Sequence, residues 1–204
     1  WQEKVAPDVI LMDDGSIPDF STMGAFVAFD EKWPEETALI EKNFVPFYWN
    51  MEKYKGHVYA VPFIASIGPM LAYNKAVLEE AGYSKPPETW DELLQVAEAT
   101  KTPKRYGIIL PATQGTNDIN IFEIIFMTNG GRYLSEDGKK VILNDPGVVD
   151  ALQLYADILK KGVAPPGLLE LDYMKMTELF YKGQASMIGG WSWIPAIADA
   201  INIP

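Results

Sequence analysis

The stretch Gly56–Lys75, reading GHVYAVPFIASIGPMLAYNK, limits the possible folds of this chain more than any other. It contains two apolar runs, Val58–Pro62 and Met70–Tyr73, which are too short and too uniformly apolar to be amphipathic helices and are typical of buried strands. Phe63–Pro69 separates them without periodicity, and it lacks the Asn-Gly or Asp-Gly pair of a tight hairpin. We therefore interpret the stretch as a crossing between two packed bodies.

Patterns on both sides of the crossing alternate strand and helix, so the chain is predicted to be α/β. A length of 204 residues permits two small domains. We place the first domain at residues 1–64 and the second at residues 65–204. The first would be a partial domain, and the second a larger one.

Composition excludes several classes of function. The chain has 28 acidic and 17 basic residues, and a net charge of −11 disfavours binding to nucleic acid or to an anionic membrane surface. It has no cysteine and one histidine, His57, which excludes disulfides and thiolate chemistry and disfavours a zinc site. No glycine-rich phosphate loop occurs. We therefore predict no catalytic residue, no metal ligand and no cofactor.

Two aspartates in the first body are candidate ligand contacts. Val9–Met12 is predicted to be a buried strand, and Asp13 and Asp14 follow it, ahead of a helix that begins near Pro18. In open α/β sheets ligands bind at the carboxyl ends of strands. The commoner role of aspartates in such a loop is to cap the helix in solvent, so both interpretations stay open here.

The second body has clear element boundaries. Thr89–Glu92 has the pattern of a capping box, which predicts a helix start. Asp145 followed by Pro146 predicts another helix start. Tyr106–Leu110 and Ala185–Ile188 are predicted strands, because each is a short apolar run.

Four further candidates lie in this body, at predicted helix starts and strand ends. Asp118 and Asn120 belong to a polar loop ahead of an apolar helix, and Trp191 and Trp193 follow a predicted turn at Gly189-Gly190. Acids and amides hydrogen-bond to hydroxyls, and an exposed indole stacks on the apolar face of a pyranose, so the set suits a neutral polar ligand. Packing at a helix start is the equal alternative for the two tryptophans.

The order of motifs along the chain resembles that of a known family. The most specific motifs are YAVPF…AYNK, PPETWDEL and F-x-x-G-x-A-x-M. TNGG and the double-tryptophan segment also occur in the order that the family has. Together they resemble the family 1 extracellular solute-binding proteins of ABC sugar importers, relatives of the maltose- and oligosaccharide-binding proteins. The resemblance implies a two-lobed α/β fold of the periplasmic-binding-protein type II kind. It also implies that the chain is partial, with part of lobe one and most of lobe two.

The resemblance also implies contacts to the ligand from both sides of the crossing. The positions that match are Asp13, Ser66, Ile67, Asp118, Asn120 and Trp191. Many members have an acid near the place of Ile67, so its apolar side chain weakens any expectation of maltose specificity.

A receptor function follows from the resemblance. Such a protein would bind a sugar or oligosaccharide between its lobes by hinge closure and deliver it to an ABC permease in the membrane. It would be periplasmic or extracellular, and a lipid anchor is compatible with this. The alternatives are a carbohydrate-active enzyme that uses a pair of carboxylates in the cleft, and a polyamine- or metal-binding member of the same superfamily.

Family members have more chain at both ends than this sequence. A strand that neighbours Val9–Met12 in the family has no match here, and its loss would expose an apolar sheet edge. We therefore expect the chain to dimerise or exchange strands, and to bind a sugar weakly.

Overall fold

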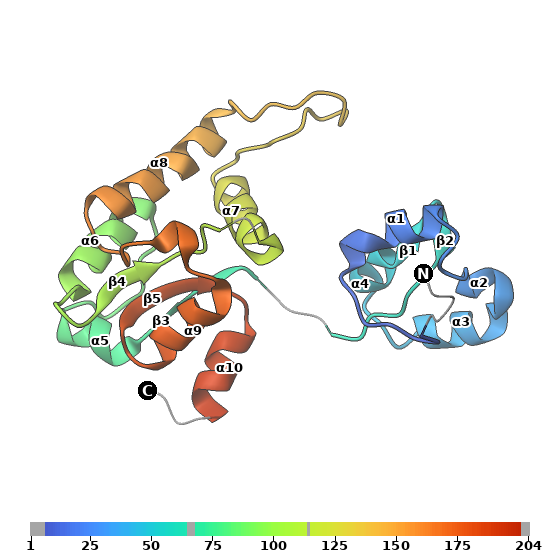
Figure 1. Cartoon of the computed structure of the whole chain (residues 1–204), viewed down its shortest axis with the longest axis horizontal. Helices are drawn as coiled ribbons and strands as arrows, with labels where there is room; N and C mark the ends of the chain where they lie inside the picture. Colours follow the sequence, from blue (N-terminus) through green and yellow to red (C-terminus); the bar gives the residue numbers. More distant parts are fainter. Residues whose placement is uncertain (1–6, 65–67, 114, 201–204) are drawn as a thin grey trace. The chain divides into compact units, whose positions relative to one another are not determined.

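The computed structural model describes residues 7–64, 68–113 and 115–200, and it divides into two compact units, Trp1–Ala65 and Ser66–Pro204 (Figure 1). The first unit is mainly helical. Its elements are η1 (Asp14–Ser16), α1 (Ile17–Thr22), α2 (Phe29–Lys32), α3 (Pro34–Glu41), α4 (Pro46–Met51), β1 (Lys53–Tyr54) and β2 (His57–Val58).

A short hairpin closes the first unit. β1 and β2 pair antiparallel, and the turn residues Lys55 and Gly56 both have positive φ, at 50° and 90°. Two-residue hairpins favour turns of this kind, because their twist matches that of the strands. Asp30 ties helix α2 to the hairpin: its Oδ1 accepts a hydrogen bond from the Val58 amide at 2.8 Å, and its Oδ2 lies 3.1 Å from His57 Nδ1.

The prediction of a strand at Val9–Met12 is wrong. These residues form no regular strand, and Val9 and Leu11 are 85% and 73% exposed. The physical reason is that a strand needs a hydrogen-bonded neighbour, and the part of the chain that the structure describes offers none to this segment. The strand predicted at Val58–Pro62 is also shorter than expected, since only His57–Val58 pairs.

The second unit is a three-stranded mixed sheet covered by helices (Figure 1). Its elements are β3 (Met70–Tyr73), α5 (Lys75–Glu80), α6 (Trp90–Thr100), β4 (Tyr106–Ile109), α7 (Thr116–Thr128), α8 (Pro146–Lys160), η2 (Leu168–Glu170), α9 (Tyr173–Tyr181), β5 (Ala185–Gly190) and α10 (Trp193–Ala200). The strand order is β3-β5-β4, so the last strand in the chain is the central one. β5 runs antiparallel to β3, with Met70 opposite Gly190, and parallel to β4, with Ile108 opposite Met187.

The hydrophobic core of this unit lies around the sheet. Ile108, Met187 and Ile188 of the sheet are completely buried, as are Ala97 of α6 and Met176 of α9. All of β5 is buried, which explains why its residues are apolar or small throughout.

Short-range signals in the sequence are confirmed at two helix starts. Thr89 Oγ1 accepts a hydrogen bond from the Glu92 amide at 3.2 Å, and Asp145 Oδ1 accepts one from the Gly147 amide at 3.0 Å. The capping box differs in one respect. The Glu92 carboxylate bonds to the amide of Glu88 at 2.8 Å, so it caps one residue further out than the pattern predicts.

Candidate functional site

The carboxyl end of strand β5 is where the second unit concentrates candidate ligand contacts. The predicted turn at Gly189-Gly190 is wrong, because both glycines belong to the strand and pair with β3. Close packing explains them. A Cβ on Gly189 would lie 2.6 Å from Leu110 Cδ2, and one on Gly190 would lie 2.2 Å from Ile194 Cδ1. The two glycines thus let the side chains of neighbouring elements close over the strand end.

An aromatic cluster of Tyr173, Trp191 and Trp193 lies just after the end of strand β5. Trp191 leaves the strand, and its amide donates a hydrogen bond to the hydroxyl of Tyr173 in α9 at 3.2 Å. The rings of Tyr173 and Trp193 meet edge to face, with centroids 5.7 Å apart and an interplanar angle of 77°. Both tryptophans are partly exposed. The indole Nε1 of Trp191 is covered and has no hydrogen-bond partner among the described residues.

Helix α7 borders the same strand end. Its residue Ile121 is buried, and Ile121 Cγ2 would lie 3.7 Å from a Cβ on Gly189. Asn120, the preceding residue, is partly buried. Asp118 belongs to the first turn of this helix, but its side chain lies outside the described residues. The structure therefore places Asn120, Trp191 and Trp193 on elements that converge at one end of the sheet.

The remaining predicted residues are separate from this group. Asp13 is exposed and precedes η1 without a side-chain capping bond, and Asp14 is the first residue of η1 and is partly buried. Both belong to the first unit. Ser66 and Ile67 lie outside the described residues.

Reasoning from the sequence missed Glu52 in the first unit. Burial raises the pKa of Glu52 above its ordinary value, and the negative charge of Asp14 raises it further. No local pattern in the sequence could have found this pair, because the two residues come from η1 and from the end of α4.

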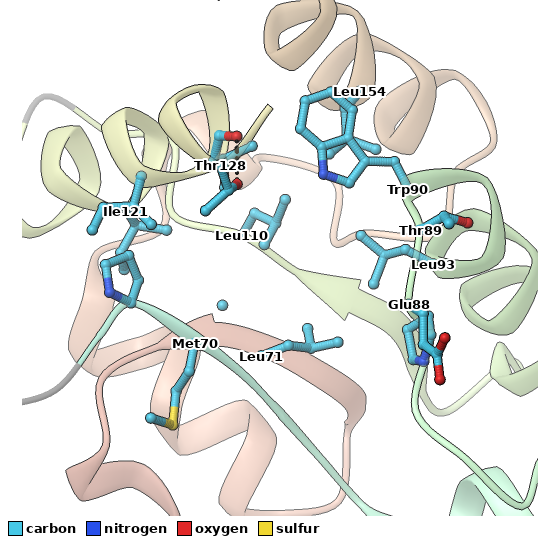
Figure 2. Close-up of a pocket in the computed structure, with 15 residues that line it drawn as sticks. Met70, Leu71, Glu88, Thr89, Trp90, Leu93, Leu110, Ile121, Thr128 and Leu154 are labelled. Carbon is cyan, nitrogen blue, oxygen red and sulfur yellow. Dashed lines mark hydrogen bonds between the residues drawn. The ribbon is translucent and has the colours of Figure 1, made fainter. Parts of the chain in front are cut away.

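An apolar pocket of about 210 Å³ lies within the second unit (Figure 2). Leu71 of β3, Leu110 at the end of β4 and Ile121 of α7 line it, and Figure 2 shows the Trp90 indole at its border. None of the eight residues predicted from the sequence belongs to its lining among the described residues. Its walls offer few polar atoms, so it does not suit a ligand rich in hydroxyls.

Two observations bear on other classes of site. Among the side chains that the structure describes, no three His, Asp or Glu residues converge as metal ligands would. In the same ranges no helix is long and apolar enough to span a bilayer.

Comparison with known proteins gives the family. The model of the bacterial extracellular solute-binding proteins matches residues 2–204. The chain belongs to this family. Its members are substrate-binding proteins, so the alternative of a carbohydrate-active enzyme finds no support in the family.

Individual proteins that are similar to this chain support the same family assignment. A maltotriose-binding protein of Pyrococcus abyssi is 30% identical over 95% of this chain and 40% of its own length. The maltose-bound MalE3 of T. maritima has a TM-score of 0.85 at 25% identity, over 97% of this chain and 49% of that chain. A solute-binding protein from Agrobacterium radiobacter in complex with ribitol has a TM-score of 0.77 at 29% identity, over 90% of this chain and 46% of that chain.

The fold is thus that of the type II periplasmic binding proteins, present in part. The chain spans about half the length of the solved structures it matches, and 40% of the Pyrococcus relative.

Proposed function

We propose that this chain forms part of a receptor that binds a sugar or oligosaccharide for an ABC importer. The observation that supports this most is the pair of partly exposed tryptophans at the carboxyl end of the central strand β5, in a family whose relatives include maltotriose- and maltose-binding proteins. An exposed indole face and the apolar face of a pyranose ring are complementary, because the C–H groups on that face of the sugar pack against the flat aromatic surface.

The residues have distinct roles in this proposal. Trp191 and Trp193 provide stacking surface, and the amide of Asn120 bonds to hydroxyls. Asp14, with Glu52 beside it, supplies polar contacts from the first unit. The family resemblance assigns further contacts: Asp13, Ser66, Ile67 and Asp118. Closure of the two lobes around the ligand would then present the closed form to a membrane permease, outside the cytoplasm.

A ligand-observed NMR experiment tests the proposal. Saturation transfer from the protein to maltotriose, maltose or ribitol detects binding even at millimolar dissociation constants. We expect transfer to ring protons of at least one of the two sugars, and the Pyrococcus maltotriose-binding protein serves as the positive control. The same spectra report hydrolysis, so new reducing-end signals would favour an enzyme. Transfer to none of the probes, with the control positive, would contradict the proposal.

Variants then test the role of the tryptophans. Trp191→Ala should weaken sugar binding about tenfold, since it removes a stacking surface. Trp33→Ala is the matched control, because Trp33 is 43% exposed and has no role in the proposal. Equal affinities of the two variants would remove Trp191 from the site.

A further inference from the structure

The pocket in Figure 2 lies between two hydrophobic clusters of the second unit. The main core surrounds the sheet, and a smaller cluster consists of Phe126 of α7 with Val148 and Ala151 of α8. Trp90 and Ile125 pack against both clusters. The pocket has walls from both sides, since β3 and α6 contribute to its lining as well as α7 and α8. Helices α7 and α8 therefore do not close completely onto the sheet.

The walls of this pocket are mostly aliphatic. Leu93, Leu110, Ile121 and Leu154 line it, and each of them is buried. Protein interiors are normally packed as densely as organic crystals, so a space here deprives its walls of contacts that an occupant would restore. Cavities of ~150 Å³ lined by leucine, isoleucine and phenylalanine stay free of water and take up benzene. A pocket of about 210 Å³ therefore suits one six-membered ring with a short substituent.

One polar group at the border of the pocket is a hydrogen-bond donor. The indole Nε1 of Trp90 donates to no other residue that the structure describes, and Figure 2 shows the nitrogen-bearing edge of the ring turned toward Leu110. The Thr128 hydroxyl, by contrast, already donates to the carbonyl of Ile125 at 2.9 Å. An indole nitrogen can only donate, so a single acceptor atom of a ligand would satisfy it.

Charge at the pocket is sparse. Glu88 is the one charged residue among the described lining residues, and it is exposed to solvent. Because no basic side chain lines the pocket, a ligand carboxylate would lose its hydration there without compensation. An ion pair with an exposed carboxylate contributes little, so a cation gains no advantage either. The lining therefore favours an uncharged ligand.

We propose that this pocket is a second ligand site of the chain, for a small uncharged ring compound with one acceptor oxygen. The ring lies among Leu93, Leu110, Ile121 and Leu154, and a carbonyl oxygen on the ring or its substituent accepts the hydrogen bond of Trp90 Nε1. Aryl ketones and alicyclic ketones have this combination. The inference does not depend on the proposed function, since none of the eight predicted sugar contacts belongs to the described lining.

Indole NMR signals test the hydrogen bond. The chain has six tryptophans, so a ¹⁵N-labelled sample gives six side-chain N–H signals, and Trp90→Phe identifies that of Trp90 by its loss. Acetophenone is the probe, and benzoate is its matched anion. Acetophenone should shift the Trp90 signal in a saturable manner, and benzoate should not. Trp90→Phe, followed by leucine and isoleucine methyl signals, should bind acetophenone about 3- to 10-fold more weakly, because it keeps a ring but loses the donor.

A variant that fills the pocket tests the location. Leu71 of β3 lines the pocket and is only partly buried, so Leu71→Phe adds ring atoms there and should abolish the saturable shift. Leu159→Phe makes the same change on α8 outside the lining, at a leucine that is 42% exposed, and should bind as the wild type does. Circular dichroism verifies the folding of both variants. Acetophenone should raise the unfolding temperature of the wild type and of Leu159→Phe, and not that of Leu71→Phe.

Three results would overturn the inference. They are the absence of a saturable shift in the wild type, equal acetophenone binding by Leu71→Phe and the wild type, and benzoate binding as strong as that of acetophenone. If Leu71→Phe does not fold, Trp90→Phe decides, because an unchanged affinity would remove the indole donor from the site. The outcome of the sugar experiments does not affect these measurements, which use a different ligand and different residues.

Discussion

Single glycines decide how closely the elements of the second unit approach one another. Gly107 in β4 is the clearest case, since a Cβ there would lie 2.0 Å from the carbonyl oxygen of Ala97 in α6. Backbone atoms cannot give way as a flexible side chain would. The spacing between α6 and the sheet therefore depends on this residue.

Gly107→Ala should lower the free energy of unfolding by about 3 kcal/mol or more, because the new methyl group must push α6 away from the sheet. Gly138→Ala is the control: nothing lies within 4 Å of its Cβ position, and its φ is +67°. That variant should cost only about 1–2 kcal/mol of backbone strain. Urea unfolding measures both values, and equal losses would show that the close approach to Ala97 carries no cost.

Asp30 should make the stability of the first unit depend on pH. Burial raises the pKa of this carboxyl, but hydrogen bonds from the Val58 amide and from His57 outweigh it, so the pKa lies below its ordinary value. A carboxyl with a lowered folded-state pKa stabilises the fold above its unfolded pKa, and this contribution disappears as the pH falls through the folded value.

Asp30→Asn should therefore destabilise the first unit near pH 7, and the difference from the wild type should shrink as the pH falls below about 4. Asparagine keeps an oxygen that can accept the Val58 amide, so the variant isolates the charge. Thermal unfolding followed at several pH values checks this. A difference that stays constant with pH would refute the assignment.

Helix α8 depends at its start on one side chain. Asp145 Oδ1 accepts the Gly147 amide at 3.0 Å, and Pro146 occupies the first turn, where the missing amide is not needed. Asp145→Ala should cost about 1 kcal/mol of stability. Asp145→Asn should cost much less, because asparagine caps helices as well as aspartate does. Chemical denaturation of the three proteins provides the comparison, and an equal loss in both variants would assign the effect to charge.

The elements that could be predicted are those with signals inside one or two turns. The cap at Thr89 depends on residues close in sequence, and it is confirmed. The strand Met70–Tyr73 is also confirmed, because its apolar run finds a distant partner in β5. The strand at Val9–Met12 could not be judged in this way, because a strand exists only with a partner. Gly189 and Gly190 looked like a turn because their true reason, the contacts with Leu110 and Ile194, is long-range.

The candidate site shows the same limit. Trp191 could be selected because it follows a predicted strand at a helix start and matches a position of the family that the motifs resemble. The raised pKa of Glu52 could not be anticipated, since it arises from burial and from Asp14, whose position relative to α4 is a property of the fold.

Several large apolar residues of the first unit are exposed to solvent. In the first unit the side chains of Val9, Leu11, Phe63 and Ile64 are 85%, 73%, 78% and 81% exposed. Exposed apolar side chains favour association, and the dimer or strand exchange expected from the sequence stays a prediction.

Light scattering after gel filtration should give a mass above 22.8 kDa at micromolar concentration. Leu11→Lys should shift the protein toward the monomer, because it replaces an exposed apolar side chain with a charged one. Leu169→Lys changes an exposed leucine of the second unit and should have no such effect. A monodisperse wild-type monomer would contradict the expectation.

The strand order β3-β5-β4 has a consequence for the time at which the second unit can form. Strands β3 and β4 do not pair with each other, and the strand that joins them begins only at Ala185. On a ribosome, both earlier strands leave the exit tunnel long before their common neighbour exists. Their pairing closes long loops, which makes it slow. The sheet therefore cannot be completed before β5 is available, because both other strands pair with it.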